Sequence, residues 1–215
     1  MYLPKDFTED RVPVLHQAIR RARLGTLVTL GADGIEASHV PMLVDPEPQP
    51  FGTLHGHIAR ANPQWRRATR EVQALAIFLG PDAYITPAWY ETKRQSGKVV
   101  PTWNYVAIHA YGPLAFYEDA DRLLALVTRL TETHEAGRDQ PWAVSDAPKD
   151  FIAGMLKAIV GFELPIARLE GKWKMSQNRP AADRAGVVAG LTREGGPEEA
   201  AVADIVRARS EPSRG

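Results

Sequence analysis

Residues 54–67 read Leu54-His55-Gly56-His57-Ile58-Ala59-Arg60-Ala61-Asn62-Pro63-Gln64-Trp65-Arg66-Arg67 and decide how the rest of the chain is interpreted. The first half alternates, because His55 and His57 fall on one face of an extended chain while Leu54 and Ile58 fall on the other. The second half carries the signals of a helix start. The stretch therefore predicts a strand that runs directly into a short helix.

The start of this helix has the chemistry of an anion site. Asn62 is a favourable N-cap residue, and Pro63 suits the first helical position. A helix that begins here points its free N–H groups and the positive end of its dipole towards the strand end. Arg60 before the cap, with Arg66 and Arg67 after it, adds positive charge. The pattern indicates a phosphate site, although ordinary helix capping without a ligand explains the same residues.

The composition is that of a globular protein. The 215 residues are 44% hydrophobic and 24% charged, with 26 basic and 26 acidic residues, so no global charge directs the chain to nucleic acid. The absence of cysteine excludes disulfides, thiol catalysis and cysteine-bound metal. No secretory signal and no membrane-length apolar run is found, so we expect a cytoplasmic protein that does not enter a membrane.

Short strands dominate the first two thirds of the chain. Residues 26–30 and 35–44 flank a Gly-Ala-Asp-Gly turn, which predicts a hairpin. Further strands are expected at 53–59, 73–79, 83–86, 102–117 and 160–169, with a turn at 80–82 and a polar surface loop at 91–98. Helices are expected at 10–24, where Gly25 would be the C′ residue, and at 119–135, 148–157, 187–191 and 197–209.

This order of elements predicts the fold class. Six or seven closely spaced strands without alternating helices argue against a parallel doubly wound sheet. We expect a mainly β protein, an antiparallel barrel decorated with helices. Residues 1–192 would form one domain and residues 193–215 a helical tail whose last residues are disordered.

Seven ordered motifs, which span residues 1 to about 192, resemble the PaiB family. Members of that family are described as FMN-binding negative transcriptional regulators related to the pyridoxamine-phosphate-oxidase-like split barrels. The resemblance implies an FMN-binding split β-barrel. The motifs are Met1-Tyr2-Leu3-Pro4-Lys5, Ser38-His39-Val40-Pro41, Gly56-His57-Ile58-Ala59-Arg60-Ala61-Asn62-Pro63-Gln64-Trp65, Pro87-Ala88-Trp89-Tyr90, Pro101-Thr102-Trp103-Asn104-Tyr105, Ile159-Val160-Gly161-Phe162 and Lys174-Met175-Ser176-Gln177-Asn178-Arg179.

Related split barrels are homodimers with FMN at the subunit interface, so the resemblance implies a site built from both chains. One chain would place Ser38 and His39 beside the flavin ring, with Arg60 and Asn62 at the phosphate. The ribityl chain would follow His57, Ile58 and Ala59. The partner chain would contribute Trp103, Asn104, Lys174, Gln177 and Arg179.

Simpler interpretations apply to several of these residues. Trp103 lies on the polar aromatic face of the 102–117 strand and fits a dimer interface as well as a flavin wall. The polar residues 174–179 also suit the exit from a last strand. His39, His55, His57 and His109 could supply a three-histidine metal site, but no acidic residue lies within residues 54–67, and we assign no metal.

The resemblance implies an FMN-binding negative regulator or flavin-dependent sensor. An FMN-dependent oxidoreductase similar to flavin reductases is the alternative, and a haem-binding or haem-degrading protein is a third possibility. DNA contact has weak support, since no helix-turn-helix precedes a basic recognition helix. No nucleophile–base set is visible, so no catalytic residue is assigned.

Overall fold

The computed structural model describes residues 1–210, which form two compact units. The first unit contains Met1–Arg11, Leu79–Ile108 and the chain from Glu170 onwards, and the second contains Val12–Phe78 and His109–Leu169. The final five residues, where the predicted tail was expected to be disordered, lie outside the described residues. The domain division at residue 192 stays a prediction.

The second unit is built on antiparallel strands in the order β5-β2-β3-β4-β8-β7. The expected hairpin is confirmed, because β2 and β3 pair in register from Leu24↔Pro41 to Gly31↔Gly34. The bounds are β2 Leu24–Gly31, β3 Gly34–Asp45, β4 Thr53–Ala59, β5 Ala74–Ile85, β7 Ala115–Tyr117 and β8 Ile159–Pro165. Three helices belong to the same unit, α1 Val12–Ala22, α4 Ala120–Glu135 and α5 Lys149–Leu156, with the single turn α2 Gln64–Arg67 and the 3-10 turn η3 Val144–Asp146.

The end of α1 corrects one prediction. Gly25 is not the C′ residue, because β2 has already begun at Leu24 and the left-handed residue is Arg23, with φ 59°. Gly25 is required for another reason, since a Cβ there would lie 2.6 Å from Cε1 of Phe78. Close packing against an aromatic ring, rather than a turn, accounts for this glycine.

The central strand β4 has one buried and one half-exposed face, as its alternation predicts. Leu54 and Ile58 point into the core, where Val160, Phe162 and other large apolar side chains are also buried. Gly56 lies between them on the same face. A Cβ at Gly56 would lie 2.5 Å from Cζ of Phe162, so the glycine lets the ring cross the strand.

Gly56→Ala is expected to lower the free energy of unfolding by about 2 kcal/mol, because the added methyl displaces a buried ring in a close-packed core. Urea unfolding measures the change. Gly154→Ala is the matched control. Its Cβ would meet nothing within 4 Å on an exposed turn of α5, so it should stabilise the protein by up to about 1 kcal/mol. Equal effects of the two variants would contradict this packing argument.

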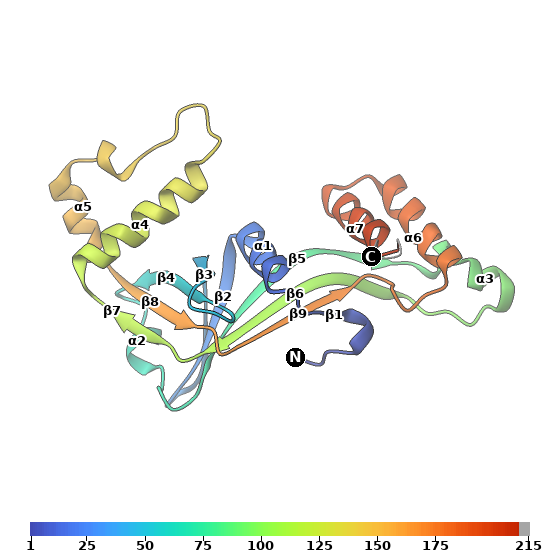
Figure 1. Ribbon diagram of the computed structural model, residues 1–215, viewed down its shortest axis with the longest axis horizontal. Coiled ribbons are helices and arrows are strands. Elements are labelled where there is room, and N and C mark those ends of the chain that lie inside the picture. Colours follow the sequence, from blue (N-terminus) through green and yellow to red (C-terminus); the bar gives the residue numbers. More distant parts are fainter. Residues whose placement is uncertain (211–215) are drawn as a thin grey trace. The chain divides into compact units, whose positions relative to one another are not determined.

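Helix α4 covers the half-exposed face of the second unit's strands (Figure 1). It begins at the N-cap Asp119, whose carboxylate accepts from the N–H of Arg122 at 2.8 Å. Its buried stripe contains Leu123, Leu126 and Leu130. Leu124, the neighbour of Leu123 in the chain, is 38% exposed and lines a cavity of about 620 Å³ between α4 and α5.

Several strand boundaries differ from the sequence prediction. The chain does not turn at Gly80-Pro81-Asp82, since β5 runs through these residues without interruption. The predicted strand 102–117 divides at Pro113-Leu114 into β6 and β7, and the strand 160–169 divides after Pro165 into β8 and β9. Nine strands therefore form in residues 1–210 instead of six or seven.

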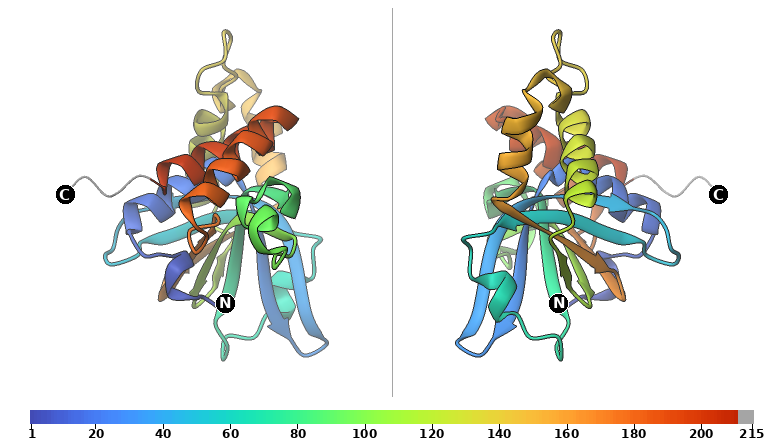
Figure 2. Two further views of the ribbon diagram at one scale, coloured as in Figure 1. Left: turned by 90° about the vertical axis from the view of Figure 1, so that its right-hand side faces the viewer. Right: turned by 90° about the vertical axis from the view of Figure 1, so that its left-hand side faces the viewer.

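The first unit has the strand order β1-β9-β6-β5. Its further elements are β1 Thr8–Glu9, β6 Thr102–Gly112, β9 Arg168–Lys174, α3 Glu91–Ser96, α6 Ala181–Glu194, α7 Pro197–Ala208, η1 Lys5–Phe7 and η2 Pro87–Trp89. Three strands, β5, β6 and β9, contribute residues to both units. Helices α6 and α7 pack side by side (Figure 2). Among residues 1–210, no helix has the length and apolar character needed to cross a membrane.

The segment 91–98 was predicted to be a loop, and this prediction is wrong. Glu91–Ser96 forms α3, whose first turn is held by the fully buried Asp183. One carboxylate oxygen accepts from the N–H of Thr92 at 2.9 Å and the other from its hydroxyl at 2.8 Å. Gly97, with φ 67°, ends the helix. A distant cap and a C-terminal glycine thus replace the missing apolar periodicity.

Candidate functional site

Asn62 connects the turn after β4 to strand β3. Its Nδ2 donates to the hydroxyl of Ser38 at 2.8 Å, and its Oδ1 accepts from the N–H of Gln64 at 3.0 Å. Pro63 stands at the N-cap position of α2, one residue later than predicted for the cap, and Asn62 bonds to the first helical N–H from the residue before it. Asn62 also holds the turn against β3. The helix is a single turn of four residues, so its dipole is small and its free N–H groups are few.

Gln64 holds the same turn against strands β2 and β3. Its side chain is 1% exposed, and its Nε2 donates to the carbonyl of Leu27, the hydroxyl of Thr29 and the carbonyl of Glu36 at 3.1, 3.1 and 3.3 Å. Three acceptors around one atom identify it as the nitrogen of the amide. Gln64 thus ties the turn to both strands of the β2–β3 hairpin. Its Oε1 is buried without a partner in the described part of the chain.

Arg60 is engaged rather than free. Its guanidinium donates to the carboxylate of Glu118, to the carbonyl of Lys157 at 2.6 Å and to the carbonyl of Ile159 at 3.3 Å. The indole N–H of Trp65 donates to the Arg60 carbonyl at 2.9 Å. The predicted phosphate ligand is therefore an ion-pair partner in this structure, where it joins the end of β4 to the start of β8.

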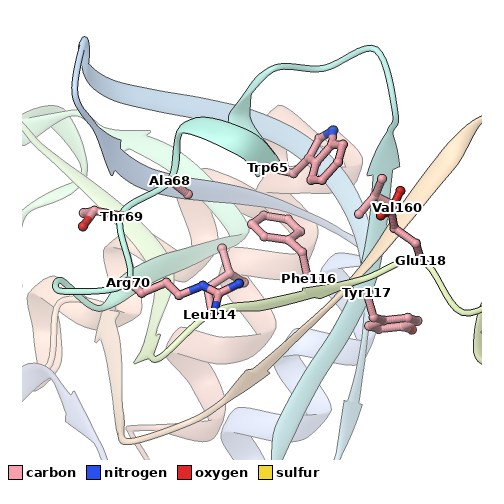
Figure 3. Close-up of a pocket in the computed structure, with 9 residues that line it drawn as sticks. All are labelled: Trp65, Ala68, Thr69, Arg70, Leu114, Phe116, Tyr117, Glu118 and Val160. Atoms are coloured by element: carbon pink, nitrogen blue, oxygen red, sulfur yellow. The ribbon is translucent and has the colours of Figure 1, made fainter.

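A cavity of about 270 Å³ lies beside this turn. Figure 3 shows Trp65, Phe116 and Val160 on one side and the guanidinium of Arg70 directed towards Leu114. Nine residues line the cavity: Trp65, Ala68, Thr69, Arg70, Leu114, Phe116, Tyr117, Glu118 and Val160. Arg70 forms no ion pair with another residue of the described chain. The cavity thus has apolar walls, an unpaired cation and the one carboxylate that Arg60 neutralises.

The remaining predicted residues of β3 and β4 are placed differently from one another. His39 is exposed, and its Nδ1 lies 2.9 Å from the hydroxyl of Thr26. Ile58 is buried in the core, and Ala59 pairs with Ile159 in the ladder. Only the backbone of Ile58 could therefore face a ligand.

His57 faces a second cavity, of about 290 Å³, under the C-terminal half of α4. This cavity is also lined by Pro41, His134 and Trp142. Burial lowers the pKa of His57, so its imidazole is neutral at pH 7. The structure thus places His57 in a cavity other than the one beside Arg70.

The partner-chain group of the prediction lies in the first unit. Lys174 donates to the hydroxyl of Thr102 and to the carbonyl of Trp103, the latter at 2.6 Å. Burial, followed by the charges of Lys172 and Arg179, lowers the pKa of Lys174. Trp103 itself is 53% exposed and contacts Tyr84 edge to face, with ring centroids 5.9 Å apart.

Asn104 is fully buried, accepts a hydrogen bond from the hydroxyl of Ser176 at 3.1 Å, and has no partner for its Nδ2 among the described residues. Gln177 folds back on its own turn, accepting from the N–H of Met175 and donating to the carbonyl of Trp173. Arg179 lies over the ring of Tyr90 at 4.7 Å. These side chains position residues 173–179 and leave one buried amide donor unused.

The histidines considered as metal ligands have separate surroundings. His55 lies between Asp45 at 3.1 Å and Glu163 at 3.6 Å, and His109 is 3.1 Å from the Tyr111 hydroxyl. Burial is the largest influence on His55 and lowers its pKa despite the two carboxylates. Within residues 1–210, no group of three or more His, Asp or Glu side chains could hold a metal ion.

Sequence reasoning missed three residues of the turn and cavity. Gln64 lies within the predicted helix start but received no role there, and Arg70 received none either. Glu118 comes from a distant segment, 58 residues after Arg60. The position of Gln64 between Pro63 and Trp65 is the one sequence signal that could have suggested its burial. The pairing of Glu118 with Arg60 depends on tertiary structure and has no such signal.

The solved structures that resemble this chain define the class of the fold. A conserved hypothetical protein from Mycobacterium tuberculosis superposes with a TM-score of 0.57 at 14% identity, over 84% of this chain and 94% of that one. The antiparallel order of the strands and this likeness confirm the predicted class, a mainly β antiparallel split barrel decorated with helices.

The chain belongs to the family described as "Putative FMN-binding domain", whose model matches residues 1–168. An uncharacterized protein from Emericella nidulans is 36% identical over 246 residues, covering 98% of each chain. The protein named protease synthase and sporulation protein PAI 2 from Bacillus subtilis is 32% identical over 206 residues, covering 96% of each chain. These matches confirm the resemblance to the PaiB family and FMN as the cofactor of the family.

Proposed function

We propose that the protein binds FMN and acts as a cytoplasmic flavin-dependent sensor or negative transcriptional regulator of the PaiB type. The observation that carries the proposal is the anchored turn at Asn62, which is tied to β3 through Ser38 and to the β2–β3 hairpin through Gln64. Family membership supplies the ligand, and the turn supplies a rigid place for its phosphate.

The residues around the turn fit a phosphate group. The guanidinium of Arg70 is unpaired in the described chain and reaches into the adjacent cavity (Figure 3). Arg–phosphate contacts are charge-assisted and strong. Glu118 is the unfavourable group, because its carboxylate also lines the cavity, and Arg60 offsets that charge. A cavity of about 270 Å³ suits the phosphate and part of the ribityl chain rather than the whole cofactor.

The second group of residues fits the flavin ring in a homodimer. We infer that Trp103, Asn104 and Lys174 of a partner subunit complete each site. The exposed indole of Trp103 offers an apolar contact to the ring. The fully buried Asn104 would support this surface from inside its own chain through the hydrogen bond from Ser176. Lys174, whose pKa burial lowers, is the nearby cation. FMN supplies electron transfer when it is bound, and these side chains would orient its ring and favour a negative charge on it.

Titration of the purified protein with FMN tests the proposal. We expect saturable quenching of flavin fluorescence with a dissociation constant in the micromolar range or tighter, roughly −8 kcal/mol. Riboflavin, which lacks the phosphate, should bind at least about tenfold more weakly. Absence of saturable FMN binding, or equal affinity for both flavins, would overturn the assignment of a phosphate site.

Two further measurements separate a regulator from an enzyme. A gel shift with promoter DNA, with and without FMN and at two salt concentrations, measures specific DNA binding. A sedimentation experiment at the same protein concentration measures the dimer. A dimer that binds FMN and shifts its own promoter supports the regulator. Turnover of a nicotinamide nucleotide without a shift would instead favour the FMN-dependent oxidoreductase.

A further inference from the structure

Gln64 is the most completely buried polar residue of the turn, and it does not itself offer a free donor to a ligand. Both hydrogens of its amide nitrogen are directed at three acceptors on β2 and β3. The same residue is bonded through its backbone N–H to Asn62 and through its carbonyl to the N–H of Ala68. Gln64 is the first residue of the single-turn helix α2, and its backbone bonds to the residues on either side of that helix, Asn62 and Ala68.

The position of the whole segment depends on few other contacts. The N–H of Thr69 donates to the Leu30 carbonyl at 2.8 Å, and Ala68 forms an isolated bridge with Gly31. These contacts hold the exit of the segment near the tip of the hairpin. At the entrance, Asn62 bonds to Ser38. Between the two ends, the Gln64 side chain provides the buried tie to β2 and β3, and the exposed guanidinium of Arg67 adds an ion pair with Glu36 at 3.0 Å.

The chemistry of the amide explains why glutamine stands here. Hydrogen bonds in the interior are costly to leave unmade, and a methionine or leucine of the same size would leave the Thr29 hydroxyl and two carbonyls without this donor. The Oε1 atom of the same Gln64 amide is buried without a hydrogen-bond partner among the described residues. Unsatisfied buried atoms in native proteins call for an explanation, and here one atom is left unpaired so that three acceptors are satisfied.

We propose that Gln64 is a positioning residue for the flavin phosphate, which acts by fixing the turn that carries Asn62 and leads to Arg70. This inference rests on the proposed FMN site. It assigns to Gln64 an effect on phosphate recognition without contact between Gln64 and the ligand. A merely structural role would weaken all flavins equally, whereas a positioning role changes the preference for FMN over riboflavin.

Gln64→Met removes the three donated bonds at nearly constant volume. We expect FMN affinity to fall about tenfold or more while riboflavin affinity changes less than about twofold, because a misplacement near 1 Å weakens contacts made only by the phosphate. Fluorescence titration with both flavins gives the ratio. Gln17→Met, an exposed glutamine on α1, is the matched control and should leave both affinities unchanged.

Thr29→Val keeps the inference testable if the methionine variant fails to fold. It removes one of the three acceptors and leaves the Gln64 amide two carbonyls, so the FMN-to-riboflavin ratio should fall about threefold. A folded Gln64→Met or Thr29→Val with an unchanged ratio overturns the inference and leaves the FMN site intact. A wild-type protein that binds no FMN overturns the proposed function, and the inference with it.

Discussion

Glu9→Gln is expected to lower the free energy of unfolding by about 3 kcal/mol at pH 7, because it breaks a buried ion pair from one side. The Glu9 carboxylate is 4% exposed. One oxygen accepts from the N–H and Nε of Arg11 at 3.1 and 2.8 Å, and the other accepts from a terminal nitrogen of Arg11 and from Arg209. This residue joins β1 to the end of α7 within the first unit.

The pH dependence has a definite sign. Burial by itself would raise the pKa of Glu9, but the hydrogen bonds from Arg11 and Arg209 outweigh it and lower that pKa from 4.5 to about 2. A depressed pKa contributes stability that is present above about 4.5 and is lost as pH falls through about 2. A pKa lowered from 4.5 to about 2 corresponds to about 3 kcal/mol of stability.

Urea unfolding at several pH values measures this contribution. The difference in the free energy of unfolding between wild type and Glu9→Gln should be largest at pH 7, become smaller below pH 4.5 and disappear near pH 2. Glu194→Gln, at the exposed C-terminal end of α6, should change stability by less than about 0.5 kcal/mol. A difference that persists unchanged at pH 2 would contradict the ionic origin of the effect.

Local patterns predicted what depends on local chemistry. The hairpin at Ala32-Asp33, the Asp119 cap and the alternation of β4 follow from turn residues, capping and period-two burial. The prediction failed where distant groups decide. Asp183 caps α3 from 91 residues away, and residues 80–82 stay extended inside β5 although glycine and proline there suggest a turn.

The candidate site divides in the same way. Asn62 and Pro63 before α2 predicted a helix start, and the helix begins at Gln64, whose N–H donates to the Asn62 side chain. The ion pair of Arg60 could not be predicted from the sequence, because its partner Glu118 lies 58 residues later, just after β7. The side of β4 that His57 occupies was predicted, but the helix that covers it was not. The sequence predicts which residues are charged and which face of a strand they occupy. It does not predict which distant residues they pair with, because that depends on the tertiary structure.

Arg60→Met is expected to weaken FMN binding by about threefold to tenfold while riboflavin binding falls much less. Without the Arg60 guanidinium, the Glu118 carboxylate that lines the cavity is left uncompensated beside the phosphate. The Arg60 and Glu118 side chains are 34% and 52% exposed, so solvent screens the pair and the expected loss is about 1 kcal/mol. The same titrations with both flavins measure it, and thermal unfolding confirms that the variant is folded.

Glu118→Gln is the matched partner variant, with the opposite expected sign. The Arg60 guanidinium is then released from its counter-charge next to the phosphate, so FMN affinity should rise about threefold to tenfold while riboflavin affinity stays constant. In the double variant both charges are absent, and FMN affinity should lie between those of the two single variants. A double-mutant cycle gives the coupling between Arg60 and Glu118 directly. Weaker FMN binding by Glu118→Gln would mean that the carboxylate positions Arg60 for the phosphate rather than competing with it, because only then does removal of a negative charge reduce affinity for an anion.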